Sequence, residues 1–278
     1  GRYIMNKFDM YEGMAVSSSD DLYFLKMFSD YDRCTDEPLK ILYEDVNSFY
    51  FKELRKILNI EVLYDGEDEL KKVSQLKRWA VDYLGFKGKE LASRRYDKLD
   101  CIEIISIAKS EGYALNCRYI SLIFTIILLA AGFKARLVSC MSMDLRDNEC
   151  HWVTEVYIQK LKKWIVVDVP LDFFYFDQRG NLLNLIEMRR LIISGKELKL
   201  FSTNSEHIMF AQQYWKKNIF RFKFILENKH DMLSSNKRDF IVLNPKGFKM
   251  EDKIIKSSKN VITSIHYCYN DKYFWEDI

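Results

Sequence analysis

The sequence predicts an α+β protein in which a buried central helix packs on an antiparallel sheet, with a helical extension before this core and a mixed extension after it. Three observations predict this fold. Residues 116–133 form the most apolar stretch of the chain, and only Ser121 and Thr125 are polar between Ile120 and Ala131. Residues before this stretch recur with the period of helices, and residues after it have the pattern of a β-hairpin.

The composition limits the classes of function. The chain of 278 residues is 48% hydrophobic and 15% aromatic, which is ample for a large core. The charges nearly balance, with 43 basic and 40 acidic side chains and a net charge of +3, so we expect no nucleic-acid partner. The apolar stretch is shorter than the roughly 17–25 residues that a membrane helix needs, so we expect no integral membrane segment. The oligomeric state stays open.

The cysteines do not have the spacing of a disulfide framework. Cys140 and Cys150 are interpreted either as one bridge or as two buried thiols. The chain begins at Gly1, so a signal peptide would not be visible. We expect a periplasmic or secreted protein if such a peptide was removed, and a cytoplasmic protein otherwise. The six cysteines are Cys34, Cys101, Cys117, Cys140, Cys150 and Cys268.

Residues 1–66 are predicted to form a helical extension packed on the core. Ser17–Asp21 resembles the entry of a helix over Leu22–Phe28, and a second helix is expected over Asp45–Leu58. No motif in this part of the sequence indicates chemistry.

Residues 67–200 are predicted to form the core domain. It begins with a helix over Glu67–Leu84, whose apolar residues recur every three or four positions and whose first turn is acidic. A turn at Phe86–Lys89 leads to a further helix over Leu99–Ser110. Gly112 then interrupts the pattern just before the central helix.

The central helix carries Cys117 at its start and ends near Gly132, a position where a left-handed residue is common. A thiol in the first turn faces unpaired backbone N–H groups and the positive end of the helix dipole. Both favour the thiolate, which is the reactive form. Cys117 is therefore the candidate nucleophile.

Three strands are predicted after Gly132. The first covers Ala135–Cys140. The second and third, His151–Ile158 and Trp164–Val169, form a hairpin around the polar turn Gln159–Lys163, because β-branched and aromatic residues dominate both.

The hairpin brings a base and an acid together. Strand side chains alternate between faces, so His151 and Asp168 share a face if they lie directly opposite each other. That register leaves a turn of Gln159 and Lys160 alone, or of Ile158–Leu161. Directly opposed residues are close enough for an imidazole N–H to reach a carboxylate.

The end of the chain is predicted to add a helix and strands. Asn184 resembles a helix cap for Leu185–Ser194, with Glu187 completing a capping box. Residues 201–278 are expected to form an extension, as a second layer or a small β-rich subdomain. Its elements are expected at His207–Asn218, Phe220–Leu226, Phe240–Leu243 and Val261–Cys268. Aromatic residues here, such as Tyr214, Trp215, Phe220 and Phe222, are interpreted as packing residues.

Three motifs in this order resemble the transglutaminase-like superfamily. Cys117 begins a buried helix that is followed by G-F-K-A-R from Gly132, similar to the G-x-x-A-R of that family. H-W-V-T-E-V from His151 is similar to H-x-W-V-E-V, and K-W-I-V-V-D, which ends at Asp168, is similar to G-W-x-x-x-D-P. The resemblance covers about residues 70–200, and its last part is similar to bacterial members of the superfamily.

The resemblance implies a papain-like α+β fold with a Cys-His-Asp triad. Cys117 is expected to attack an amide carbonyl, His151 to transfer the proton and Asp168 to orient His151. The implied substrate is a protein or peptide, with no cofactor and no metal. We favour hydrolysis, as in a protease, amidase or deamidase, over cross-linking, because nothing resembles the extra domains or calcium sites of animal cross-linking enzymes.

Two departures from the family pattern lie beside these residues. Trp152 directly follows His151, where the family has its tryptophan one place later, and Val169 separates Asp168 from Pro170. The backbone N–H of Cys117 is the candidate oxyanion donor. Trp79 could donate its indole N–H, but its helical period fits a core residue better.

Plainer interpretations exist for each residue alone. Cys117 could be an inert buried thiol, and His151 an ordinary strand residue. A metal site at Cys140, Cys150 and His151 is disfavoured, because neighbouring strand residues point to opposite faces and the sequence has no C-x-x-C pair. The alternative to an enzyme is a binding or scaffold protein that retains the fold without turnover.

Overall fold

The computed structural model describes residues 19–32, 39–85, 98–112, 115–202, 204–250, 253–258 and 260–275. The predicted turn at Phe86–Lys89 and Cys34 lie outside them. The helices are α1 (Ser19–Met27), α2 (Phe49–Leu58), α3 (Glu69–Leu84), α4 (Cys101–Glu111), α5 (Cys117–Ala130), α6 (Leu185–Ile193), α7 (Ser205–Asn218) and α8 (Lys272–Trp275). The strands are β1 (Leu42–Tyr43), β2 (Ala135–Met141), β3 (Cys150–Ile158), β4 (Lys163–Asp168), β5 (Phe173–Phe174), β6 (Arg221–Ile225), β7 (Glu227–Asn228), β8 (Lys237–Leu243), β9 (Lys253–Ser258) and β10 (Val261–Cys268).

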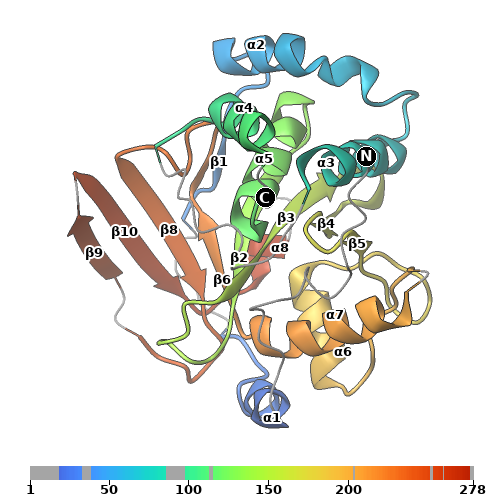
Figure 1. Ribbon diagram of the computed structural model, residues 1–278. Coiled ribbons are helices and arrows are strands. Elements are labelled where there is room, and N and C mark those ends of the chain that lie inside the picture. Colours follow the sequence, from blue (N-terminus) through green and yellow to red (C-terminus); the bar gives the residue numbers. More distant parts are fainter. Residues whose placement is uncertain are drawn as a thin grey trace.

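A central sheet separates two layers of helices (Figure 1). Within the described residues it has eight strands in the order β5-β4-β3-β2-β6-β8-β10-β9. Its neighbouring strands are antiparallel, apart from the parallel pair β8 and β10. The predicted α+β class, with a buried helix on an antiparallel sheet, is confirmed.

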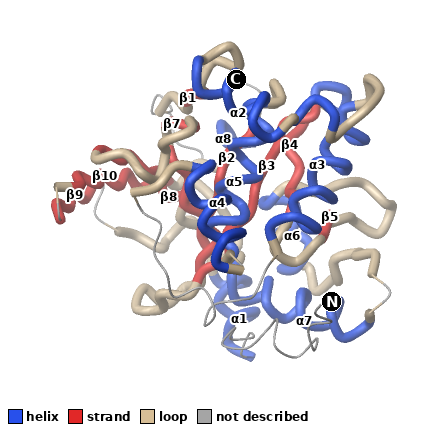
Figure 2. Tube along the Cα trace, turned by 45° about the horizontal axis from the view of Figure 1, so that its top comes forward, coloured by secondary structure: helices blue, strands red, loops and turns tan. Residues whose placement is uncertain are grey.

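One face of the sheet packs against α2, α3, α4 and α5. Strand residues such as Leu137, Trp152 and Val167 belong to this core. Figure 2 shows α5 against β2 and β3, the strands that it contacts most. Every residue of α5 from Tyr119 to Ala130 is buried, as the apolar sequence predicts. No described helix has the length and apolarity needed to span a membrane.

The opposite face packs against α1, α6 and α7. The residues that alternate with the first set, such as Val138, Val153 and Val166, belong to this second core. Trp215 from α7 is fully buried in it, which agrees with the interpretation of Trp215 as a packing residue. The central strands of the sheet therefore have a hydrophobic core on each face.

The first helices follow the sequence prediction closely, with one shift. The second helix begins at Phe49 and not at Asp45, because Ser48 caps it and accepts a hydrogen bond from the backbone N–H of Phe51 at 3.3 Å. Asp45 instead begins a turn, and its side chain accepts from the N–H of Asn47 at 2.8 Å. Arg55 of α2 donates to the backbone oxygen of Ala130 at 2.8 Å, which fixes α2 to the end of α5.

The central helix ends as predicted. Gly132 has a φ of 89°, and its N–H donates to the oxygen of Leu129 at 3.0 Å. The N–H of Phe133 donates to the oxygen of Leu128 at 2.9 Å, which completes a Schellman motif. A side chain at position 132 would strain this left-handed backbone, so glycine lets the chain turn directly into β2.

The strands predicted after Phe201 do not form a sheet of their own. Strand β6 pairs with β2, so β6, β8, β10 and β9 extend the sheet of the core, while α7 lies in the second helical layer. A short parallel pair, β1 with β7, ties the N-terminal part to this half of the chain. Capping of α6 by Asn184 and Glu187 occurs as predicted.

Candidate functional site

A polar stripe on α5 docks this helix on β3. Ser121 donates to the backbone oxygen of Trp152 at 2.8 Å, and the hydroxyls of Thr125 and Thr154 lie 2.9 Å apart. Cys117 belongs to the same stripe, because residues four apart lie on one face of a helix. The polar residues in the apolar stretch therefore set how α5 lies along the strand that carries His151.

Cys117 is the first residue of α5 and is partly exposed. Asn116 caps the helix by accepting from the N–H of Tyr119 at 3.1 Å. Sγ of Cys117 lies 3.7 Å from the backbone oxygen of Cys150, the first residue of β3. Because Cys117 is the first residue of α5, its backbone N–H has no acceptor within this helix.

The predicted register of the hairpin is wrong by two residues. Strand β3 pairs Ile158 with Lys163 and Thr154 with Val167, and a loop of 159–162 with a 3₁₀ turn joins the strands. This loop is centred one residue later than either predicted turn, so Asp168 is shifted along β3, and His151 is its diagonal neighbour and not its direct partner. A shift of two keeps both side chains on one face, and diagonal neighbours remain within reach of long side chains.

His151 and Asp168 are in contact across this diagonal. Nε2 of His151 lies 2.9 Å from Oδ2 of Asp168, and both side chains are fully buried. Burial opposes the charged imidazolium, but the charge and hydrogen bond of Asp168, together with the Cys117 thiol, raise the pKa of His151 to about 10. Nδ1, the other ring nitrogen, is buried and makes no hydrogen bond to the described residues.

The end of β4 explains how the thiol reaches the ring. His151 faces the core of α6 and α7, whereas α5 covers the other face of the sheet. Strand β4 ends at Asp168, so the first residues of β3 have no pairing partner on that side. The N-terminus of α5 occupies this position, since Cys117 and Ser121 contact the backbone oxygens of Cys150 and Trp152. Because Asp168 engages Nε2, Nδ1 is the nitrogen available to the thiol.

Asp168 is held by two further donors that the sequence did not reveal. Tyr175 donates its hydroxyl to Oδ2 of Asp168 at 2.5 Å, and the N–H of Leu171 donates to Oδ1 at 3.1 Å. Trp215 of α7 donates its indole N–H to the Tyr175 hydroxyl at 2.6 Å. A continuous chain of hydrogen bonds thus runs from Trp215 through Tyr175 and Asp168 to His151. No local sequence pattern marks Tyr175 or Trp215.

Two aromatic rings from α7 hold the imidazole in place. The rings of Tyr214 and Trp215 each lie edge-on to His151, with centroids 5.2 Å away. Such edge contacts fix the ring plane without competing for its nitrogens. The C-terminal extension of the prediction therefore supplies part of the surroundings of His151.

The remaining motif residues form a buried ion pair. Arg136 of β2 lies 3.2 Å from the carboxylate of Glu155 on β3, and its guanidinium is 3.7 Å from the centre of the Trp164 ring. Glu155 also accepts from the N–H of Leu185, the first residue of α6, at 3.1 Å. Burial raises the pKa of Glu155 to about 7, against the lowering effect of Arg136. This pair joins three elements that surround the site.

Cys140 and Cys150 are two free thiols, so the prediction of a bridge between them is excluded and the alternative of two thiols holds. Cys140 is buried and Cys150 is partly exposed. Burial raises the pKa of both, which keeps them protonated and weakly nucleophilic at neutral pH. Among the described residues, no group of three or more His, Cys, Asp or Glu side chains could hold a metal ion.

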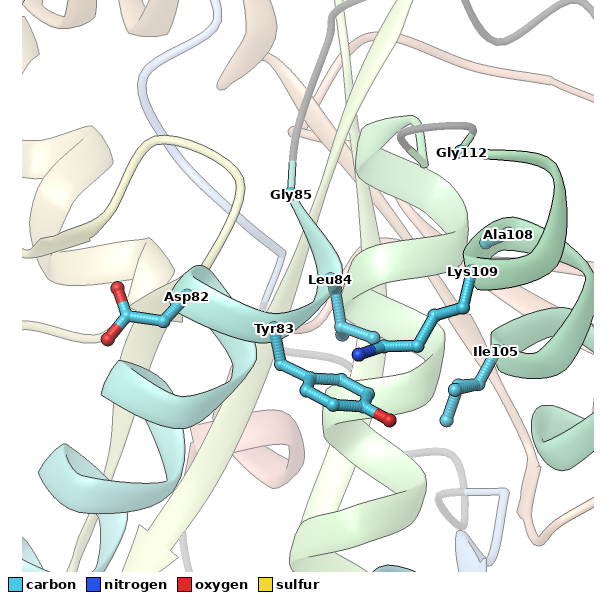
Figure 3. A pocket seen from close by; sticks show the side chains of 8 residues that line it. All are labelled: Asp82, Tyr83, Leu84, Gly85, Ile105, Ala108, Lys109 and Gly112. Carbon is cyan, nitrogen blue, oxygen red and sulfur yellow. The ribbon is translucent and has the colours of Figure 1, made fainter. Parts of the chain in front are cut away.

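A separate pocket of about 290 Å³ lies between the C-terminal ends of α3 and α4, with Tyr83 and Lys109 on its wall (Figure 3). The Lys109 ammonium lies over the Tyr83 ring. This pocket contains none of the predicted site residues. Trp79, the other candidate oxyanion donor, is partly buried against the core and stacks on Tyr83 at 4.7 Å, which fits its core interpretation.

Known proteins are similar to parts of this chain. The sequence profile described as "Transglutaminase-like superfamily" matches residues 58–169. No curated protein matches the sequence. A solved structure from Cytophaga hutchinsonii, described as a candidate cysteine protease, is similar with a TM-score of 0.34 and 17% identity over 55% of this chain and 47% of its own. The chain thus aligns with about half the length of that protein. LapG from Legionella pneumophila, treated with EGTA, has a TM-score of 0.32 and 16% identity over 59% of this chain and 84% of its own.

Proposed function

Because residues 58–169 match the sequence profile of the transglutaminase-like superfamily, we propose that this chain is a cysteine-dependent acyl-transfer enzyme that acts on amide or peptide bonds. Cys117 is the nucleophile, His151 the acid and base, and Asp168 the group that orients His151. One observation carries the proposal. His151 and Asp168 make a buried contact of 2.9 Å, and the partly exposed Cys117 thiol at the start of α5 is close enough to His151 to contribute to its raised pKa.

The resting site holds a proton on His151. The Asp168 carboxylate outweighs the effect of burial, so the raised pKa of His151 keeps the imidazolium present at neutral pH. An imidazolium beside the thiol and the N-terminal end of a helix both favour the thiolate. Cys117 is thereby activated without a metal or a cofactor in this proposal.

The acylation step uses only groups from the chain. The Cys117 thiolate attacks the carbonyl carbon, the C=O pair moves onto oxygen, and the backbone N–H of Cys117 donates to that oxyanion. His151 then gives its proton to the amide nitrogen as the C–N bond breaks. An amine or ammonia leaves, and a thioester forms on Cys117.

The thioester is resolved by a second nucleophile. Neutral His151 takes a proton from water, the resulting hydroxyl attacks the thioester, and the thiolate leaves as the acid is released. We propose hydrolysis as the main outcome, since water reaches a partly exposed thioester without a dedicated binding site. A lysine amine in the same role would give a cross-link instead.

A peptide-library incubation tests the proposal. Wild type and Cys117→Ala are incubated with the library and read by mass spectrometry, which separates cleavage, deamidation and amine incorporation. We expect hydrolysed products with wild type alone. Asn116→Ala serves as a folding control, because it alters the same helix end and retains the thiol. No products with either protein would favour a scaffold, and products that persist in Cys117→Ala would show that Cys117 is not the nucleophile.

A further inference from the structure

Two cations lie at one indole ring next to Cys117. The strand register aligns Trp152 with Ser139, and Ser139 with Lys223, so these three side chains share the face of the sheet that α5 covers. Nζ of Lys223 lies 5.5 Å from the centre of the Trp152 ring, and the guanidinium carbon of Arg118 lies 5.8 Å from the same centre. Trp152 thus brings together two positive charges from different elements.

These charges are close to the proposed nucleophile. Arg118 directly follows Cys117 in α5, and the Cys150 thiol interacts electrostatically with both Cys117 and Lys223. Cys117, Arg118 and Lys223 are all partly exposed. Both cations therefore lie in the neighbourhood of the thiol.

The charge of Lys223 lacks a partner within the described part of the chain, where no carboxylate lies within ion-pair distance of its ammonium. Burial, together with the positive charges of Arg118, Arg221 and Lys256, lowers the pKa of Lys223, and the Cys150 thiol opposes this effect. An anion bound near Lys223 would relieve this repulsion and stabilise its charge. The arrangement is therefore suited to a bound carboxylate.

We infer that the substrate carries a carboxylate next to the amide that Cys117 attacks, and that Lys223 and Arg118 bind this carboxylate beside Trp152. The inference rests on the proposed function, because it concerns the substrate of the same thiol. The carboxylate is either an Asp or Glu side chain or the free C-terminus of a peptide. In both cases charge-assisted hydrogen bonds from an ammonium and a guanidinium provide the recognition.

Alkylation with two small reagents tests the charge preference without a known substrate. Iodoacetate and iodoacetamide react with the same thiolate and release the same iodide, but only iodoacetate carries a carboxylate. A change in the amount of thiolate alters both alkylation rates at Cys117 by the same factor, so the ratio of the iodoacetate rate to the iodoacetamide rate does not depend on it. We expect Lys223→Gln and Arg118→Gln each to lower this ratio by about three- to tenfold, the size expected for one nearby charge in a partly solvated site.

The control variant is Lys196→Gln. It removes the same charge from an exposed position after α6, where no contact with the Trp152 cations is present. We expect its ratio to equal that of wild type. Equal ratios in wild type, Lys223→Gln and Arg118→Gln, with Cys117 still reactive toward iodoacetamide, would overturn the inference and leave the proposed function intact. An inert Cys117 would overturn both.

Peptides distinguish the two sources of the carboxylate. One set carries internal Asp or Glu with an amidated C-terminus, and its matched set carries Asn or Gln. A third set has the free C-terminus as its only carboxylate. The set that wild type turns over faster than the matched Asn or Gln set, either the first or the third, identifies the source of the carboxylate. We expect Lys223→Gln to reduce the turnover of that set by at least about fivefold. Equal turnover of all sets would contradict the inference.

Discussion

Ser121 and Trp152 join the central helix to the strand that carries His151. The hydroxyl of Ser121 donates to the backbone oxygen of Trp152 at 2.8 Å, on the side of β3 where β4 has already ended and no described strand pairs with Trp152. One turn earlier in α5, Cys117 makes the equivalent contact with the oxygen of Cys150. The distance between thiol and imidazole therefore depends on how this helix is held against β3.

We expect Ser121→Ala to destabilise the fold. The variant leaves the buried oxygen of Trp152 without its donor, and an unsatisfied buried group costs about 1–3 kcal/mol. Urea denaturation measures the loss in the free energy of unfolding. Ser110→Ala is the matched control, because its hydroxyl bonds to Ile107 on the exposed surface of α4, and we expect a change within about 0.5 kcal/mol. Equal losses in the two variants would refute a special role for Ser121.

Tyr175 and Tyr214 make a matched pair of variants around His151. Tyr175→Phe removes the donor to Asp168 and leaves the indole N–H of Trp215 without an acceptor, so we expect a loss of about 1–3 kcal/mol in unfolding free energy. Tyr214→Phe retains the ring that packs on His151, and its hydroxyl has no hydrogen bond to a described residue. We expect a loss below about 0.5 kcal/mol there. Similar losses in both variants would contradict this assignment.

Asp168→Asn should change the pH dependence of Cys117 alkylation. The Asp168 charge is what raises the pKa of His151 against burial, so the neutral amide leaves a neutral imidazole at pH 7. Without an imidazolium beside it, the thiolate is less favoured. We expect iodoacetamide labelling at pH 5.5 to fall at least about tenfold, and the difference to shrink above pH 9, where an ordinary thiol ionises unaided.

Circular dichroism of Asp168→Asn shows whether the variant is folded, because Asp168 also accepts from Leu171 and Tyr175. With a folded variant, equal labelling rates at pH 5.5 would show that Asp168 does not activate the thiol.

Stability should fall as the pH rises from about 5 to 10. The folded-state pKa of His151 is raised to about 10 from 6.5, and that of Glu155 to about 7 from 4.5. Between each pair of values the folded state holds a proton that the unfolded state has lost, so the free energy of unfolding decreases with pH. Each group contributes a slope of at most about 1.4 kcal/mol per pH unit.

His151→Gln separates the two contributions. We expect the decrease above pH 7 to disappear in this variant, while the decrease between about pH 4.5 and 7 persists because Glu155 is unchanged. Urea denaturation at a series of pH values measures both. A stability that rises through pH 7–10 in wild type would contradict the raised pKa of His151.

Much of the fold could be predicted because local signals agreed with the tertiary structure. The apolar stretch of α5, the cap at Asn184 and the turn at Gly132 are each set by residues within a few positions of one another. The candidate nucleophile and its partners could be named because their elements were recognisable. The predicted register of the hairpin is wrong, because a two-residue shift in register preserves the alternation of faces and leaves no mark on the pattern.

The surroundings of His151 could not be predicted in the same way. Tyr175 and Trp215 are separated by 40 positions in sequence, and only the packing of α7 on the sheet brings them together. The cations at Trp152 likewise come from a helix and a distant strand. Contacts of this kind depend on the path of the chain between elements, for which a single sequence has no periodic signal.

The buried pair of Arg136 and Glu155 gives a last prediction. Arg136→Met removes the partner of a fully buried carboxylate, and breaking such a pair typically costs about 3–5 kcal/mol. The pKa of Glu155, which burial already raises and Arg136 lowers, should rise further. The loss should therefore be smaller at pH 5 than at pH 8, because a protonated Glu155 needs no countercharge.

The double variant Arg136→Met with Glu155→Gln tests whether the charge or the packing is responsible. Gln retains an oxygen for the N–H of Leu185, which Glu155 binds at 3.1 Å, and removes the unpaired charge. We expect the double variant to recover at least about half of the loss at pH 8, with a coupling of 1–3 kcal/mol in the cycle. If the two single losses simply add, the cost lies in the stacking of Arg136 on Trp164, and the ion pair is not what holds β2, β3 and α6 together.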